Sequence, residues 1–389
     1  MKQIAAALAA LLVIASVAPA GVAASGPAEQ EAEAYSGAHV SFEVENSAMT
    51  DYAVDGDVVA ETVAVESQSD HESRTGVDAG ADVELSAVTG VAGAETSLAA
   101  QSSTRASVDV GGSAEMTAHD SEHGVLVVDA GGESQYVEVG LASDAEAEQE
   151  SESRVVVTTA NGSETAFVVV GEGEMTTNEN GNVTASLGDD AKLVTRSYDE
   201  RGEDDEQTEA FIANGTATAE VYLTERDGEA VADTIEYGQD TAVEVTERSE
   251  SEVRMTAERA TEEGTVVIAS VSDAALAASD SLTVTVDGEA AAEASSYADL
   301  RNAADGGDSS AYAVRQSGSA EASAEVLVAV NHFSEREIVV ADDGASGETT
   351  EGGDGESDGE SSDGGGQPGF GVTAALAALL SLAVARIRG

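Results

Sequence analysis

The chain has 389 residues, with 76 acidic and 16 basic side chains, and its formal net charge is -60. A chain this acidic lacks the basic stripe that neutralises phosphates, which excludes nucleic acid as a partner, and the absence of cysteine excludes disulfides, iron–sulfur clusters and thiol catalysis. Because 41% of the residues are apolar, we expect a folded, halophilic protein whose self-repulsion is screened by molar salt, rather than a disordered chain. Its carboxylates are expected to attract cations diffusely.

The N-terminal segment has the layout of a secretory signal peptide. Lys2 gives a weakly basic start, and residues 4–17 form an apolar core that is too short and poorly flanked for a stop-transfer helix. Two small-residue cleavage sites follow the apolar core, one ending at Ala20 and the other at Ala24, so signal peptidase is expected to cut after one of these residues. The mature protein should therefore lack residues 1–24.

Residues 25–200 are expected to form an N-terminal β domain. Residues 39–44 alternate polar and apolar side chains, which is the period of a half-buried strand. Short runs of small residues predict further strands, which suit either a flat sandwich face or a few rungs of a β-solenoid; these runs lie at 83–88, 107–110 and 114–117. With no tryptophan and 3% aromatic residues, the core must consist of valine and alanine.

Two pairs of valine-rich runs predict β-hairpins. Residues 124–128 and 135–139 flank a glycine turn. Residues 154–159 and 165–170 flank Asn161-Gly162, a dipeptide that tolerates the positive φ angles of a tight turn. The acidic segment between the two pairs, residues 143–153, is expected to be a solvated loop or a short helix.

An acidic linker at 201–214 is expected to lead into a C-terminal β region at 215–342. In this region Asp227-Gly228-Glu229-Ala230 recurs 60 residues later as Asp287-Gly288-Glu289-Ala290, and a valine-rich run recurs at the same offset. The region is interpreted either as two copies of one small β module or as chance similarity in a chain rich in alanine and glutamate. Residues 296–304 are expected to form a short helix.

The composition changes sharply near the C-terminus. Residues 343–367 are almost entirely glycine, serine, threonine, aspartate and glutamate, which predicts a disordered, extended stalk. Pro368-Gly369-Phe370 follows, then an apolar run over 371–385 and a basic end with Arg386 and Arg388. This order of acidic stretch, Pro-Gly-Phe, apolar helix and arginines resembles the PGF-CTERM sorting signal of haloarchaeal surface proteins.

The resemblance implies a processing route for residues 368–389. In that family an archaeosortase cuts at the signal, and the new C-terminus receives a membrane lipid. The length of the apolar run agrees with removal, because its 15 residues span about 22 Å as a helix, whereas crossing a bilayer takes roughly 20 residues. The alternative is a lasting transmembrane anchor. In both cases the terminal arginines favour a cytoplasmic end and an external body.

Three sequons mark candidate N-glycosylation sites at Asn161, Asn182 and Asn214, because an exported chain meets the glycosylating enzymes. A second motif, His119-Asp120-Ser121-Glu122-His123, matches the pattern of inverted zinc metalloproteases. That chemistry needs a helix, whereas a glycine and a valine-rich strand follow at once, so a connection between two strands is preferred. Calcium-loop and nucleophile-elbow patterns within 352–359 are attributed to low-complexity composition, and no catalytic or metal-binding residue is assigned.

The sequence therefore predicts an all-β protein of tandem sandwich-like modules with terminal apolar helices, with a β-solenoid as the alternative for the N-terminal half. We expect a non-enzymatic, cofactor-free glycoprotein, anchored by lipid on the outer face of a haloarchaeal membrane, with a structural or adhesive role. Its expected partners are an archaeosortase-type enzyme, the membrane, and surface-layer or surface-polysaccharide components. The alternatives are a surface-anchored module that binds a sugar or a divalent cation and, less favoured, an exported hydrolase.

Overall fold

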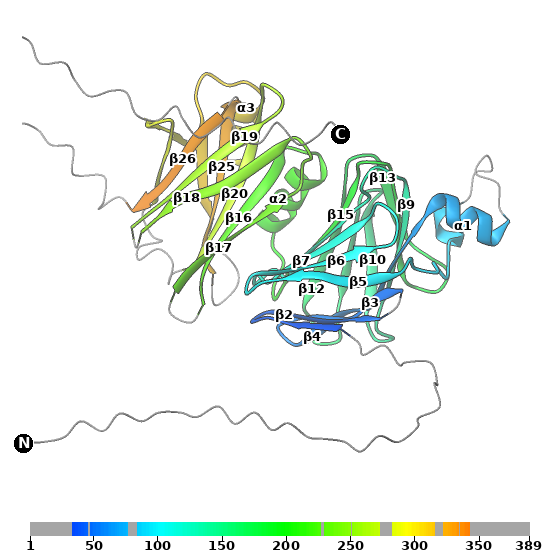
Figure 1. The fold of residues 1–389 in the computed structure, drawn as a ribbon. Helices are drawn as coiled ribbons and strands as arrows, with labels where there is room; N and C mark the ends of the chain where they lie inside the picture. Colours follow the sequence, from blue (N-terminus) through cyan, green and yellow to red (C-terminus); the bar gives the residue numbers. More distant parts are fainter. Residues whose placement is uncertain are drawn as a thin grey trace, which may run out of the picture. The chain divides into compact units, whose positions relative to one another are not determined.

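The computed structural model describes residues 33–45, 47–76, 84–226, 229–249, 251–272, 282–315, 322–333 and 335–342. In these residues the chain forms four β-sheets, with three short α-helices beside them (Figure 1). The expected all-β, sandwich-like fold is confirmed. The N-terminal half consists of antiparallel sheets and not of solenoid rungs.

The N-terminal half contains two antiparallel sheets that share one core. Sheet A has the strand order β1 (Glu33–Ser36), β2 (Val40–Glu45), β3 (Ala48–Val54), β4 (Asp57–Ser67), β9 (Gln135–Gly140), β14 (Val183–Leu187) and β13 (Gly173–Thr177). Sheet B has the order β10 (Glu146–Ser151), β11 (Arg154–Thr158), β12 (Glu164–Val170), β15 (Lys192–Tyr198), β8 (Val125–Asp129), β7 (Glu115–His119), β6 (Arg105–Val110) and β5 (Thr96–Gln101). Their shared core is mostly valine and alanine, as the composition predicts.

The C-terminal half also contains two sheets around one core. Sheet C has the order β17 (Glu229–Glu236), β16 (Ala217–Arg226), β20 (Glu263–Ser272), β25 (Ala322–His332), β24 (Ala311–Arg315) and β23 (Ala292–Glu293). Sheet D has the order β18 (Thr241–Arg248), β19 (Glu252–Arg259), β26 (Glu335–Asp342), β21 (Leu282–Val286) and β22 (Glu289–Ala290). Valine again dominates the shared core.

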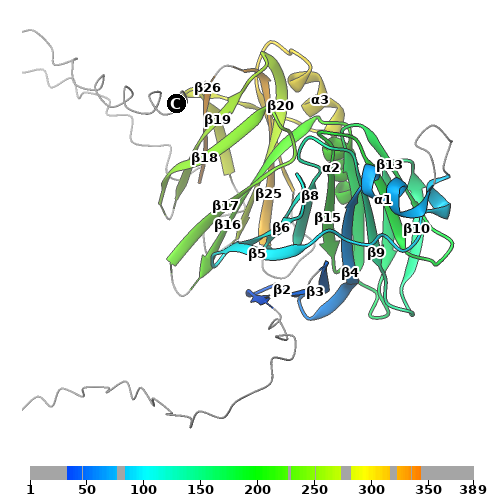
Figure 2. The same cartoon turned by 45° about the vertical axis from the view of Figure 1, so that its right-hand side comes forward.

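A third core joins the two halves. Helices α2 (Glu203–Ala213) and α3 (Tyr297–Ala304) pack here with the outer faces of sheets B and C, and both views place α2 between strands of these two sheets (Figures 1 and 2). Sheet B is therefore covered on both sides. Its strand β12 alternates between the two cores, with Phe167 in one and Val168 in the other, which explains why its sequence is a continuous apolar run.

The segment expected to be an acidic linker folds as helix α2. Its first turn carries Glu203, Asp204, Asp205 and Glu206, whose charges favour the positive N-terminal end of a helix. Phe211 and Ile212 are fully buried in the core between the halves. The acidic composition predicted a solvated segment. The segment instead packs into the core between the halves, because Phe211 and Ile212 near its C-terminal end are buried there. By contrast, the helix expected at 296–304 is confirmed as α3, capped by the Ser296 hydroxyl.

The glycine-rich turn after β8 does not close a hairpin. Strand β8 pairs with β7 and β15 in sheet B, whereas β9 pairs with β4 and β14 in sheet A, so the turn carries the chain from one layer to the other. Gly131 has φ 67°, and a Cβ there would overlap the carbonyl oxygen of Ser113. The prediction was wrong because β8 is buried on both faces and has no alternation to indicate its partner.

The second predicted hairpin is confirmed, because β11 and β12 pair antiparallel around Asn161-Gly162. Only the glycine has a positive φ, 93°, so the turn is wider than a two-residue loop. The acidic segment expected to be a loop or helix contains the edge strand β10, which is exposed but pairs with β11. The segment 83–88, expected to be a strand, contains instead a single 3-10 turn at Leu85–Ala87, and helix α1 (Gln68–Thr75) was not predicted.

The 60-residue sequence offset does not relate two copies of one structural unit. The turn at Asp287 joins β21 and β22 in sheet D, while β16 and β17, which flank Asp227 in the sequence, belong to sheet C. Between the matched ends, one segment contains strands β18 and β19 and the other contains helix α3. Asp227 itself lies outside the described residues.

Candidate functional site

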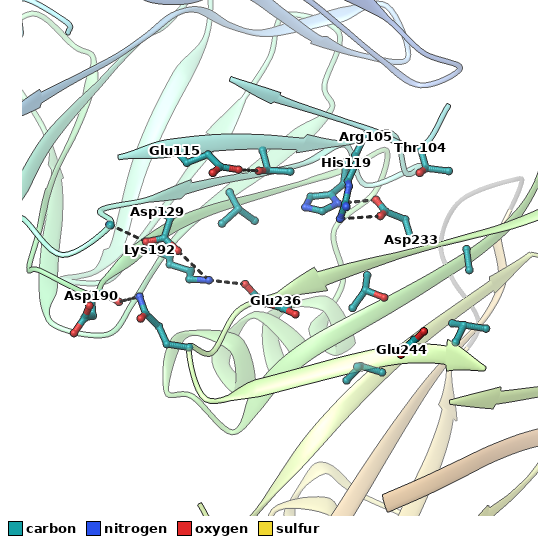
Figure 3. Close-up of a pocket in the computed structure, with 18 of the residues that line it drawn as sticks. Thr104, Arg105, Glu115, His119, Asp129, Asp190, Lys192, Asp233, Glu236 and Glu244 are labelled. Carbon is teal, nitrogen blue, oxygen red and sulfur yellow. Dashed lines mark hydrogen bonds and ion pairs between the residues drawn. The ribbon is translucent and has the colours of Figure 1, made fainter. Parts of the chain in front are cut away.

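An open cleft with a volume of about 1000 Å³ lies between the outer face of sheet B and strands β17 and β18 (Figure 3). Its floor is built by cross-strand register, because residues directly opposite each other in an antiparallel pair project from the same face. Glu115, Asp129 and Lys192 form one row across β7, β8 and β15. His119 lies opposite Arg105 in a second row, four residues further along β7, or about 13 Å.

Lys192 occupies one end of the floor. It begins strand β15, is 7% exposed, and its ammonium lies 3.2 Å from the Asp129 carboxylate. It also donates to the carbonyl oxygen of Glu236 on β17, at 3.0 Å. An ammonium has three N–H donors, and partners within the described structure take two of them. Lys192 thus joins the two walls of the cleft and has one donor left for a ligand.

His119, Asp233 and Arg105 occupy the other end. The Nδ1 of His119 lies 2.7 Å from Asp233 on β17, and both side chains are more than nine-tenths buried. Arg105 approaches the second oxygen of Asp233 at 3.6 Å, and 55% of its side chain is exposed. The Nε2 atom of His119 has no partner among the described residues, and most of the donors of Arg105 are likewise open.

The centre of the cleft is less polar than its ends. Thr117 and Val127 lie side by side on the floor. Ala232, Val243 and Val245 of β17 and β18 also line the cleft, while their side chains pack in or against the core of the C-terminal half. Carboxylates surround this centre at the margin of the cleft and belong to Glu115, Asp190, Glu236 and Glu244 (Figure 3). The cleft therefore offers paired charges at two ends, an apolar middle and a negative rim.

The His119 to His123 segment is not a zinc-binding helix. It forms the end of β7 and the turn into β8, as the following glycine and valine strand predict. His119 faces Asp233, whereas the Nδ1 of His123 lies 3.1 Å from the carbonyl oxygen of Ser197. Across the described ranges no three histidine or acidic side chains converge as a metal site. The acidic motifs at 352–359 lie outside these ranges.

The three sequons differ in accessibility. Asn161 is exposed in the turn between β11 and β12, where its amide donates to Asp57. Asn214 is exposed at the C-terminal end of α2. Asn182 is half-buried, its amide donates to Glu138 at 3.1 Å, and the threonine of its sequon, Thr184, is fully buried. The fold therefore presents two of the three sequons to an enzyme.

The processing residues fall outside the part of the chain that the structure describes. These are Ala20 and Ala24 near the N-terminus and Pro368, Gly369, Phe370, Arg386 and Arg388 near the C-terminus. Among the helices of the described ranges, none has the length and apolar content needed to cross a bilayer.

A buried charge cluster lies next to the cleft, in the core between the halves. Arg196 on β15 donates to Glu220 on β16 and to Glu325 on β25, the latter at 3.1 Å. Burial alone would lower the pKa of Arg196, but Glu220 and its neighbours hold it well above its usual value. Burial raises the pKa of Glu325, whereas Arg196 outweighs burial at Glu220 and lowers the pKa of that carboxyl.

Neither the cleft nor this cluster was predicted from the sequence. Two signals were available: Lys192 is the only lysine after residue 2, and Arg196, Glu220 and Glu325 interrupt apolar strands. Charged residues within such runs are expected to be paired, because an unpaired buried charge is very costly. The partners, however, are up to 129 residues apart, and only the fold brings them together.

No protein-family model matches the chain, and no curated protein sequence matches it. The class of protein is defined by its fold alone. It is an all-β protein of paired, largely antiparallel sheets, with a polar cleft on the outer face of sheet B.

Proposed function

We propose that the protein is an exported, lipid-anchored glycoprotein of a haloarchaeal cell surface, with a structural or adhesive role for its β body. The resemblance at Pro368-Gly369-Phe370 supports the anchoring. The charge of -60 supports a high-salt exterior, where screening permits a compact acidic fold.

One observation carries the proposal. Every described strand lies between Glu33 and Asp342, so none of these described strands includes a residue of either processing signal. Removal of residues 1–24 and 368–389 would leave every described strand and its hydrogen-bonded neighbours intact. The described β body is thus compatible with the double processing that a sorted surface protein undergoes.

The test is the chemistry of the mature C-terminus. The chain is expressed in a haloarchaeal host, recovered from membranes and digested, and its terminal peptide is analysed by mass spectrometry. We expect a lipid-modified peptide that lacks residues 371–389. Replacement of Pro368, Gly369 and Phe370 by alanine should leave the apolar run attached. An intact C-terminus on the unaltered mature chain would contradict the proposal.

The cleft supports a second function for the same body, the binding of a small polar ligand at the cell surface. The cleft holds donors of Lys192 and Arg105, the free ring nitrogen of His119 and carboxylate acceptors in a space large enough for such a ligand. This function is checked by measuring ligand binding to the purified chain. Binding should be saturable, and it should be lost when a bulky side chain is introduced into the cleft.

A further inference from the structure

We propose that this cleft binds a short, uncharged saccharide chain. The inference deepens the second function and does not depend on lipid anchoring. Failed processing would appear in the mass of the C-terminal peptide, whereas failed binding would appear in titrations of the purified chain.

The charges of the floor favour an uncharged ligand. Lys192 is neutralised by Asp129 and Arg105 by Asp233, so these four side chains sum to zero. The remaining rim carboxylates, which include Glu115 and Glu244, repel anions such as uronic acids. The rim attracts cations only diffusely, because no cluster of three metal ligands forms within the described ranges.

The open hydrogen-bonding positions suit hydroxyl groups. Lys192 has one spare donor, His119 has a free ring nitrogen, and the carboxylate oxygens of the rim can accept. A hydroxyl donates and accepts at once, so a polyhydroxylated ligand can use both kinds of group. Lys192 and His119 are nine-tenths buried and already held by their ion-pair partners, so little side-chain entropy is lost on binding.

The middle of the cleft suits the carbon face of a sugar ring. Val127 lies on the floor beside Thr117, and polar rows lie on either side of it along a floor of about 13 Å. This alternation of polar, apolar and polar surface matches a short oligosaccharide. No aromatic ring lines the cleft, so stacking is missing and the dissociation constant should be on the order of 1 mM.

A peptide fits the floor less well. Extended peptides are captured by the free edge of a sheet, where main-chain groups are unpaired. The floor strands β7, β8 and β15 are interior strands, and each is hydrogen-bonded on both sides. Basic peptides remain attracted to the rim, so trilysine is a useful competitor in the test.

The experiment uses the mature chain, purified in molar salt, and isothermal titration with maltotriose, cellotriose and mannotriose. Thr117→Phe places a ring in the centre of the cleft, and Thr62→Phe makes the same change on the exposed face of β4 in sheet A. Arg105→Gln removes an exposed donor from one end. Equal thermal midpoints establish that each variant is folded.

We expect at least one neutral trisaccharide to bind, with affinity at least tenfold weaker in Thr117→Phe, several-fold weaker in Arg105→Gln and unchanged in Thr62→Phe. Trigalacturonate should not bind. The proposal is overturned if no neutral trisaccharide binds, if Thr117→Phe binds as the unaltered chain does, or if trigalacturonate or trilysine binds more tightly.

Two sources could supply the saccharide: a surface polysaccharide, or an N-glycan on a second copy of this chain. Sedimentation of the glycosylated chain separates them. Dissociation of dimers by trisaccharide, and their absence when all three sequon asparagines are glutamine, would identify the glycan. A monomer that binds trisaccharide in both preparations would identify free polysaccharide.

Discussion

Arg196 and Glu220 form an ion pair that solvent does not reach: their side chains are 1% and 0% exposed, and they come from β15 of sheet B and β16 of sheet C. The phenol of Tyr237 donates to the same carboxylate at 2.6 Å, and the hydroxyl of Ser270 donates to its other oxygen. The Glu220 carboxylate thus accepts hydrogen bonds from Arg196, Tyr237 and Ser270, and these three donors compensate its negative charge. The two halves are therefore joined by a specific polar contact within an apolar interface.

Replacement of Glu220 by glutamine should destabilise the folded chain by about 3 kcal/mol, because breaking a buried pair leaves an uncompensated charge. The measurement is denaturant unfolding in molar salt. Glu325→Gln should cost less than Glu220→Gln, since burial already raises the pKa of Glu325 and Glu220 remains to compensate Arg196. Glu247→Gln is the surface control, with a side chain 73% exposed and an expected effect below about 1 kcal/mol. Equal effects of the three changes would contradict this account.

Glu66 should make stability fall in acid. Burial alone would raise its pKa, but Arg74, the backbone N–H of Ala92 and His71 lower the pKa to about 2, from an ordinary value of 4.5. A carboxyl with a depressed folded pKa stabilises the fold above its unfolded pKa and loses that contribution as the pH falls. The free energy of unfolding should therefore drop between about pH 4.5 and pH 2, by up to about 3 kcal/mol from this group.

The contribution of Glu66 is isolated by difference. Glu66→Gln should flatten this part of the pH dependence, and Glu61→Gln, an exposed position on the same strand, should leave it unchanged. Parallel pH curves for the unaltered chain and Glu66→Gln would show that other carboxyls produce the acid sensitivity.

Glycosylation should favour Asn161 and Asn214 over Asn182. The first two are exposed beside turns, whereas modification of Asn182 would disrupt its hydrogen bond to Glu138 and require access to buried Thr184. Glycopeptide mass spectrometry of chain recovered from a haloarchaeal host measures the occupancy of each site. Full occupancy of Asn182 with the other two empty would reverse the expected order.

Salt should stabilise the protein strongly. Raising the concentration of KCl from about 0.1 M to about 1 M shortens the Debye length from about 10 Å to about 3 Å and screens the repulsion within a chain of charge -60. We expect the thermal midpoint to rise by at least about 10 °C, or several kcal/mol at roughly 2–4 °C per kcal/mol. Sucrose at matched osmolality is the control, because it does not screen charge; an equal effect of sucrose would argue against screening.

Local pattern predicted individual elements better than their partners. Alternation at 39–44 identified β2, and the Asn-Gly turn identified the β11–β12 hairpin. The pairing of β8 was missed because both of its faces are buried, so its sequence carries no period that indicates a partner. Acidic composition misled at α2, where Phe211 and Ile212 outweigh the charged turns by docking between two sheets.

The cleft was harder to predict than the fold. Asp129 and Lys192 meet because β8 and β15 are neighbours, and His119 meets Asp233 across sheets that the sequence does not pair. Such a site depends on long-range topology and not on the spacing of a motif. The unusual residues are the only lysine after residue 2 and the charges within valine runs. They indicate that these side chains are paired, but they do not identify the partners.

The position of β26 has a mechanical consequence for an anchored protein. If the protein is tethered beyond Asp342, tension on the tether enters the body along this strand. Strand β26 is hydrogen-bonded to β19 on one side and to β21 on the other, over Glu252 to Glu258 and Leu282 to Val286. A pull along its axis loads both ladders in shear at once, so the strand resists extraction better than an edge strand, whose bonds could open one at a time.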